Sequence, residues 1–204
     1  MRSQQFFERL NQFGDFRKAT VFASEQVVNG GWEVWMQVEI AYAFSQTLTD
    51  VDRFVFEREK TYPDEDKRCD FYMGINGAAG DLDPTYMELK CINPFDLEPS
   101  KSAIVRYLVD IKKAVDVGQF VACLLVYCGN WRHVINWIKD NRGDYVRIIK
   151  DAVVYEIGND GKFYSFDVNR DLQGHNGVFM FYIDIGPQLP VGADEYPDLM
   201  LFQE

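Results

Sequence analysis

Histidine and cysteine are scarce in this chain of 204 residues. The two histidines, His133 and His175, have no serine or cysteine at a spacing typical of a catalytic triad, so we do not expect a triad hydrolase. Four cysteines do not make a disulfide scaffold in a chain of this length. Cys123 and Cys128 lack the second pair of ligands that a zinc site needs. We therefore predict reduced thiols, with three in the core: Cys69, Cys91 and Cys123.

Long apolar runs are also missing. No run reaches the roughly 18 residues that a membrane-spanning helix requires. Residues 1–10 lack the apolar stretch and the small-residue cleavage site of a secretory signal. We therefore expect a cytoplasmic protein without a membrane segment. The content of 47% apolar and 15% aromatic residues is sufficient for a packed core.

Positive charge is in short supply, with 21 Lys and Arg against 32 Asp and Glu and a net charge of -11. Taken whole, this balance argues against a nucleic-acid partner, because phosphate binding depends on cationic contacts. The charge is uneven, however. Residues 101–150 carry 9 basic and 4 acidic side chains, whereas residues 1–100 and 151–204 each have a net charge of -8. The basic middle segment suits an anionic ligand, and the acidic flanks suit a basic protein partner.

Hydrophobic periodicity predicts a mixed α/β domain, in which helices flank a central mixed sheet. The predicted helices cover residues 4–13, 32–44, 104–115 and 131–139. The predicted strands cover residues 53–60, 68–73, 86–92, 120–127, 152–156, 163–166 and 178–183, with a loop at 74–84. No linker interrupts the chain. We assign residues 1–150 to a core with an N-terminal helix, and residues 151–204 to a β-rich acidic extension of the same domain.

Side chains alternate between the two faces of a strand, and this places three charged residues together. Glu88 and Lys90 share one face of strand 86–92, and the core face carries Met87, Leu89 and Cys91. In the preceding strand, Asp70 lies on the face opposite Cys69, Phe71 and Met73. Pairing of the two strands as a hairpin therefore predicts that Asp70, Glu88 and Lys90 converge.

The converging residues suit a metal ion. Asp70 and Glu88, with the backbone carbonyl of Leu89, form a hard-oxygen site of the kind that binds Mg2+ or Mn2+. The adjacent Lys90 can orient or help to deprotonate a metal-bound water. The alternative is a solvated hairpin face on which these side chains form cross-strand ion pairs.

Asp70 followed by Glu88-Leu89-Lys90 resembles the motif of the PD-(D/E)xK nuclease superfamily, the fold of many restriction enzymes, Holliday-junction resolvases and repair nucleases. The restriction-endonuclease-like core of that superfamily, α-β-β-β-α-β, matches the predicted order over residues 32–127. The resemblance implies that Asp70, Glu88 and Lys90 are catalytic. It also implies that Asp70, Glu88 and the Leu89 carbonyl bind the metal.

Members of the superfamily often add a glutamate from the first helix of the core to the metal site. Glu39 lies on an otherwise apolar stripe of helix 32–44 and matches that position, so the resemblance makes it an auxiliary ligand. Cys69 stands where the motif has a proline before the aspartate, a position that is commonly relaxed.

Basic residues after position 110 form a candidate nucleic-acid surface. Trp131 and Trp137 are interleaved with them, which suits contacts to phosphates or bases. A solvated helix face is the alternative for this pattern. The candidate contact residues are Lys112, Lys113, Arg132, Lys139 and Arg142.

These observations predict a Mg2+-dependent nuclease that cleaves DNA by means of a metal-activated water. The residues do not separate DNA from RNA. The alternative is the same fold without catalysis, acting as a binding module for nucleic acid or for a basic protein, of an immunity or antirestriction type. For residues 151–204 we leave open a role in substrate specificity, in homodimer formation or in extending the sheet.

Overall fold

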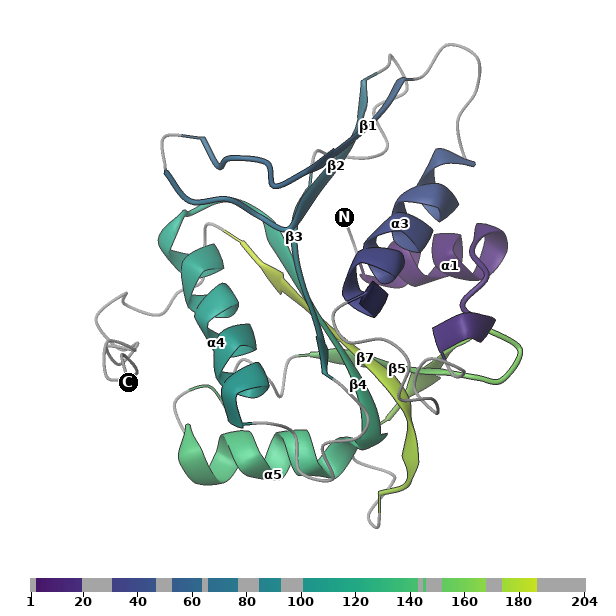
Figure 1. Ribbon diagram of the computed structural model, residues 1–204, viewed down its shortest axis with the longest axis vertical. Helices are drawn as coiled ribbons and strands as arrows, with labels where there is room; N and C mark the ends of the chain where they lie inside the picture. The colour runs from purple at the N-terminus through teal and green to yellow at the C-terminus, as the bar shows by residue number, and fades with distance from the viewer. Residues whose placement is uncertain are drawn as a thin grey trace.

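A seven-stranded mixed sheet forms the centre of the molecule (Figure 1). The computed structural model of the chain describes residues 3–19, 31–46, 53–63, 66–76, 85–92, 101–142, 145, 152–167 and 174–186. The strand order is β1-β2-β3-β4-β7-β5-β6. β3 and β4 are parallel, and the other neighbouring strands are antiparallel. None of the helices in the described ranges is both long enough and apolar enough to cross a membrane.

The elements occur in the predicted order. The helices are α1 (Ser3–Phe13), α3 (Gly31–Ser45), α4 (Lys101–Asp116) and α5 (Trp131–Asn141). The strands are β1 (Arg53–Arg58), β2 (Phe71–Asn76), β3 (Thr85–Ile92), β4 (Val121–Asn130), β5 (Val153–Ile157), β6 (Phe163–Phe166) and β7 (Asn176–Ile185). The predicted mixed α/β architecture is therefore confirmed. From α3 to β4 the order is α-β-β-β-α-β, and the later strands join the same sheet because β7 pairs with β4 along its whole length.

β4 divides the hydrophobic core into two halves. Its residues 121–127 are all buried, as predicted for a strand covered on both faces. Alternate side chains Ala122, Leu124 and Val126 pack on the face covered by α1 and α3. Cys123, Leu125 and Tyr127 pack on the face covered by α4 and α5. In the described part of the chain the elements thus form three layers, with α1 and α3 on one side of the sheet and α4 and α5 on the other (Figure 1).

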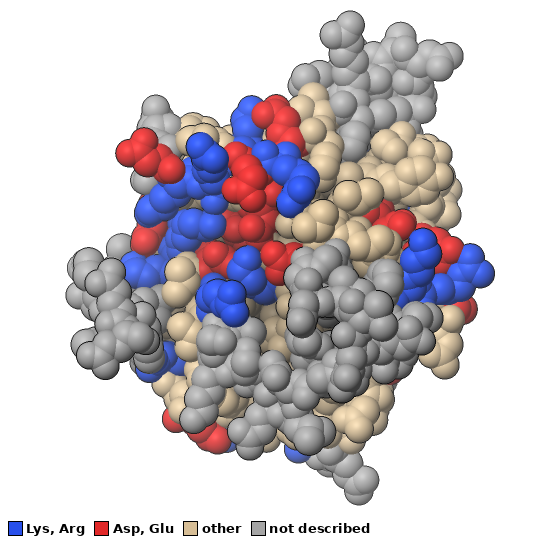
Figure 2. All heavy atoms as spheres, in the orientation of Figure 1, with Lys and Arg blue, Asp and Glu red and all other residues tan. Residues whose placement is uncertain are grey.

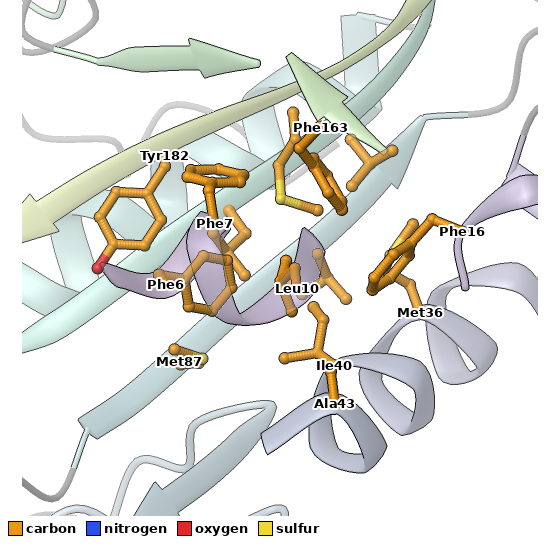
Figure 3. Close-up of a cluster of buried hydrophobic side chains, with 14 of the residues drawn as sticks. Phe6, Phe7, Leu10, Phe16, Met36, Ile40, Ala43, Met87, Phe163 and Tyr182 are labelled. Atoms are coloured by element: carbon orange, nitrogen blue, oxygen red, sulfur yellow. The ribbon is translucent and has the colours of Figure 1, made fainter. Parts of the chain in front are cut away.

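Helix α1 buries an aromatic face between α3 and the far half of the sheet. Phe6, Phe7 and Leu10 lie between α3 and the strands that carry Phe163 and Tyr182 (Figure 3). The Phe7 ring stacks on Tyr155 of β5, with 3.7 Å between ring centroids and 18° between planes. This packing joins the N-terminal helix to the strands that follow residue 151, so the two ends of the described chain share one core.

The hairpin of β1 and β2 differs from the prediction in two places. One is its closed end, near Glu59 and Asp70, and the other is the C-terminal end of β2. Glu59 has a left-handed φ of 54°, and opposite it the chain bends at Asp70. This kink interrupts the two-residue alternation, so Cys69 packs on the α4 side whereas Phe71 and Met73 pack on the α3 side. The prediction that these three residues share a face is wrong for Cys69. Residues 74–76, predicted as loop, continue β2; the predicted loop residues 77–84 lie outside the described ranges.

Replacement of Phe7 by alanine tests the contribution of α1. The buried ring loses its contacts with Tyr155 and Phe163, so Phe7→Ala is expected to lower the free energy of unfolding by about 3–5 kcal/mol. Phe120→Ala is the matched control, because Phe120 is 65% exposed, and we expect a change of no more than about 0.5 kcal/mol. Urea denaturation measures both. Equal effects of the two substitutions would contradict the packing described for α1.

Candidate metal centre

Strand β3 contributes two charged side chains to the face that α4 covers. Glu88 and Lys90 lie on the same side as Tyr86 and Ile92, opposite the apolar residues Met87, Leu89 and Cys91, as the alternation predicts. Only part of this face is exposed to solvent. Glu88 is only 1% exposed, whereas the Lys90 side chain is 22% exposed. The site therefore lies at the edge of the core, with Glu88 as its buried floor.

Asp70 and Glu33 reach the site because β2 separates from β3. The pairing of these strands ends at Phe71 and Met87, and beyond that point the edge of β3 carries backbone N–H groups. Asp70 Oδ2 accepts a hydrogen bond from the Leu89 N–H at 2.7 Å. Glu33 Oε2 of α3 accepts one from the Cys91 N–H at 3.2 Å. Two carboxylates thus replace backbone acceptors on this edge, and the backbone fixes their positions.

Helix α4 contributes Asp110 and Lys113. The Lys113 ammonium lies 2.7 Å from Glu88 Oε1 and 3.6 Å from Asp110 Oδ1, and it also donates to the Arg68 carbonyl. The Tyr62 hydroxyl, from the closed end of the β1–β2 hairpin, donates to the same Glu88 Oε1 at 2.6 Å. Glu88 is therefore held at one oxygen by a cation and by a phenol from two different elements.

The ammonium of Lys90 lies among three carboxylates. Its Nζ is 3.5 Å from Asp70 Oδ2, 3.5 Å from Asp110 Oδ2 and 3.8 Å from Glu33 Oε1. It also donates to the Leu89 carbonyl at 3.4 Å. The predicted convergence of Asp70, Glu88 and Lys90 is therefore present in the structure, with Glu33 and Asp110 added to it.

The donor set fits a divalent cation. Asp70, Glu88 and Asp110 each offer a carboxylate oxygen, and these atoms lie within 4.8 Å of one another. Glu88 Oε2 is buried and accepts no hydrogen bond within the part of the chain that the structure describes. A buried carboxylate oxygen without a partner carries an unrecovered desolvation cost, which a metal ion would remove. Oxygen-only ligation of this kind suits Mg2+ or Mn2+.

Burial and mutual repulsion shift the proton affinities of these groups. Burial, together with the charge of Asp110, raises the pKa of Glu88 to about 7, although Lys113 and Tyr62 oppose the shift. Burial likewise raises the pKa of Asp110 and of Glu33. For Lys90, burial lowers the pKa, but Asp110, Asp70 and Glu33 outweigh it, so the pKa lies above its ordinary value. Lys90 therefore stays an ammonium at neutral pH.

Glu39 does not belong to this group of side chains. Its Oε1 accepts a hydrogen bond from the Trp35 indole at 3.1 Å, within the same helix. Glu39 lies six residues after Glu33, which places it about 9 Å farther along α3 and about 120° around it. The carboxylate of α3 that contacts Lys90 is Glu33. The reason for the difference is that α3 is apolar around most of its circumference, so its sequence does not define which stripe faces the sheet.

The predicted nucleic-acid residues divide between two places. Lys113 turns inward to Glu88, and Lys112 pairs with Asp116 of α4 at 3.1 Å. Arg132, Lys139 and Arg142 belong to α5 or follow it, at the opposite end of α4 from the β1–β2 hairpin (Figure 1). Lys139 is exposed, and the guanidinium of Arg132 lies over the Trp131 ring. The α5 residues therefore do not line the site.

Basic residues nevertheless surround the carboxylates. Figure 2 shows Lys and Arg side chains on either side of a group of Asp and Glu where the β1–β2 hairpin meets the end of α4. Lys67 and Lys112, which share Asp116, belong to these two elements, as does Arg68 beside Lys113. A cationic rim around an acidic centre suits a phosphodiester held near a metal ion.

Four functional candidates were not identified from the sequence: Glu33, Tyr62, Asp110 and Lys113 as a partner of Glu88. Asp110 had a detectable signal, since it falls on the apolar face of its helix between Tyr107 and Ala114. Tyr62 carried none, because a tyrosine in a turn is most often a packing residue.

Comparisons of the chain with protein-family models, with curated proteins and with solved structures found no match.

The stability of the metal-free protein is expected to depend on the ionisation of Glu88. Its folded-state pKa of about 7 lies above the ordinary value of 4.5, so its contribution to stability is complete below pH 4.5 and is lost as the pH rises through 7. From pH 5 to pH 8 the wild type should lose about 2–3 kcal/mol of unfolding free energy relative to Glu88→Gln. Urea denaturation in chelator measures this, with Glu39→Gln expected to follow the wild type. Parallel profiles of wild type and Glu88→Gln would contradict it.

Proposed function

We propose that this protein is a Mg2+-dependent phosphodiesterase that cleaves nucleic acid, with DNA as the first substrate to test, and that its fold is of the restriction-endonuclease-like type. The observation that carries the proposal is the convergence of Asp70, Glu88 and Asp110 within 4.8 Å, beside the ammonium of Lys90. The α-β-β-β-α-β order from α3 to β4 and the motif of Asp70 and Glu88-Leu89-Lys90 support the same conclusion.

Each residue has a distinct part in the proposed chemistry. The metal, when bound by Asp70, Glu88 and Asp110, supplies Lewis-acid polarisation of the phosphate and lowers the pKa of a water. Tyr62 and Lys113 hold Glu88 Oε1, which leaves Oε2 for the ion. The Leu89 N–H holds Asp70 in the same way.

Lys90 acts through its charge. Because its pKa lies above the ordinary value, it is an ammonium and not a general base at neutral pH. A partly exposed ammonium at the mouth of the site can hold a phosphate oxygen and stabilise the negative charge that develops there in the transition state. The cationic rim of the hairpin and α4 then holds the adjacent phosphates, which accounts for nucleic-acid binding by a protein of net charge -11.

Metal binding is the first test. Mn2+ should bind the wild type in calorimetry, and Glu88→Gln should weaken binding about 100-fold or more, since loss of even an indirect partner of a metal ligand costs 10–100-fold. Glu39→Gln is the matched control, because Glu39 bonds to Trp35 and not to the site, and its affinity should equal that of the wild type. Equal affinities of wild type and Glu88→Gln would show that the ion binds elsewhere.

Cleavage is the second test. Plasmid, linear and branched DNA, and RNA of the same sequence, are incubated with the protein and Mg2+ or Mn2+. Lys90→Ala should lower the cleavage rate about 100-fold or more, as loss of one charge-stabilising donor does in other active sites. Lys60→Ala serves as control, because the Lys60 ammonium pairs with Glu57 outside the site.

Two outcomes would contradict the proposal. Cleavage that persists unchanged in both Lys90→Ala and Asp70→Asn would assign the activity to a contaminant or to another site. Mn2+ binding without cleavage of any of these substrates would favour the non-catalytic binding module.

A further inference from the structure

We infer that the site binds one divalent cation and not two, because the ammonium of Lys90 occupies the place that a second cation would take between Glu33, Asp70 and Asp110. This inference rests on the metal site proposed above and specifies how many ions it holds.

The surroundings of Lys90 are those of a bound cation. Its Nζ has one oxygen from each of Glu33, Asp70 and Asp110 within 3.8 Å, from three different parts of the fold. The backbone N–H groups of Leu89 and Cys91 fix Asp70 and Glu33 around this position. The ammonium donates one hydrogen bond to the Leu89 carbonyl, and the three carboxylates lie around it at ion-pair distance. The carboxylates form a cage of oxygens, and the chain itself supplies the cation for that cage.

The second lysine occupies a different place. Lys113 contacts Glu88 Oε1, Asp110 Oδ1 and the Arg68 carbonyl. Neither lysine contacts Glu88 Oε2, which is buried without a hydrogen bond among the described residues. The Glu88 residue is 1% exposed, so this oxygen is a fully desolvated acceptor in the carboxylate cluster, and Asp110 Oδ2 is likewise buried without a hydrogen bond among the described residues. Glu88 Oε2 marks the position of the single ion.

The charge of the cluster leads to the same number. Four ionised carboxylates and two ammonium groups leave two negative charges, which one divalent cation neutralises. A second divalent cation would make this partly buried cluster positive by two charges, and such a charge is strongly opposed in a region of low dielectric constant. Removal of the Lys90 ammonium changes both conditions, because it empties the cage and takes the net charge of the cluster from two negative to three negative.

Lys90→Ala and Lys113→Ala separate position from charge. Both variants remove one positive charge from the cluster, but only Lys90→Ala empties the cage formed by Glu33, Asp70 and Asp110. We expect the wild type to bind one Mn2+ per chain, Lys90→Ala to bind two, and Lys113→Ala to bind one with lower affinity, since Glu88 loses an anchor. The added ion in Lys90→Ala should lie close enough to the first to give the spin-coupled signal of a manganese pair.

The experiment titrates Mn2+ into the full chain, with calorimetric stoichiometry and electron paramagnetic resonance of free and bound Mn2+ as readouts. Circular dichroism checks folding, and Lys90→Gln replaces Lys90→Ala if the alanine variant is unfolded. Two ions in the wild type, one ion in a folded Lys90 variant, or two ions in Lys113→Ala would each overturn the inference and leave the metal site itself in place. No Mn2+ bound by the wild type would overturn the proposed function, and this inference with it.

Discussion

The separation of β2 from β3 at Asp70 is the constraint on which the candidate site depends. Where the backbone ladder ends, the N–H groups of β3 need acceptors, and buried N–H groups without partners are costly. Asp70 and Glu33 supply these acceptors. The same two bonds that complete the edge of the strand place two carboxylates on either side of Lys90. The hydrogen bonds that complete the edge of the sheet are therefore also the ones that position the site, because a regular hairpin at this point would use backbone carbonyls and would exclude the side chains.

Helix α4 turns this polar edge into a buried cluster. It covers Glu88 and brings Asp110 and Lys113 against it, so six charged groups share a space at the border of the core. Burial of like charges is unfavourable, and it raises the pKa of Glu88, Asp110 and Glu33. The two lysines offset part of this cost. A cation would stabilise both the remaining negative charge and the unbonded oxygen of Glu88. On the other face of the sheet, α1 packs against residues of β5, β6 and β7, and this apolar core offsets the cost of burying the charged cluster.

Local pattern predicted much of this arrangement. The element order and the shared face of Glu88 and Lys90 follow from apolar residues that recur every two residues in strands and about every 3.6 residues in helices. The buried character of β4 follows from its continuous apolar run. Glu33, and the pairing of Lys113 with Glu88, were not predicted for a common reason, namely that the rotation of a helix about its axis is set by what it packs against. In α3 the apolar residues surround the helix, and in α4 two adjacent lysines differ only in that one faces Glu88 and the other Asp116.

The sequence by itself therefore determined a mixed α/β fold and the shared face of Glu88 and Lys90, since alternation along a strand requires no knowledge of its neighbours. It also indicated Asp70, although the kink before β2, and not the alternation, places that side chain at the edge of β3. Only the tertiary structure decided that Glu33 and not Glu39 joins them, that Asp110 and Tyr62 complete the cluster, and that Cys69 faces α4. These outcomes depend on the kink at Glu59 and Asp70 and on the docking of two helices across the sheet. Such contacts join residues far apart in the chain, and their geometry is the result of packing the whole core at once.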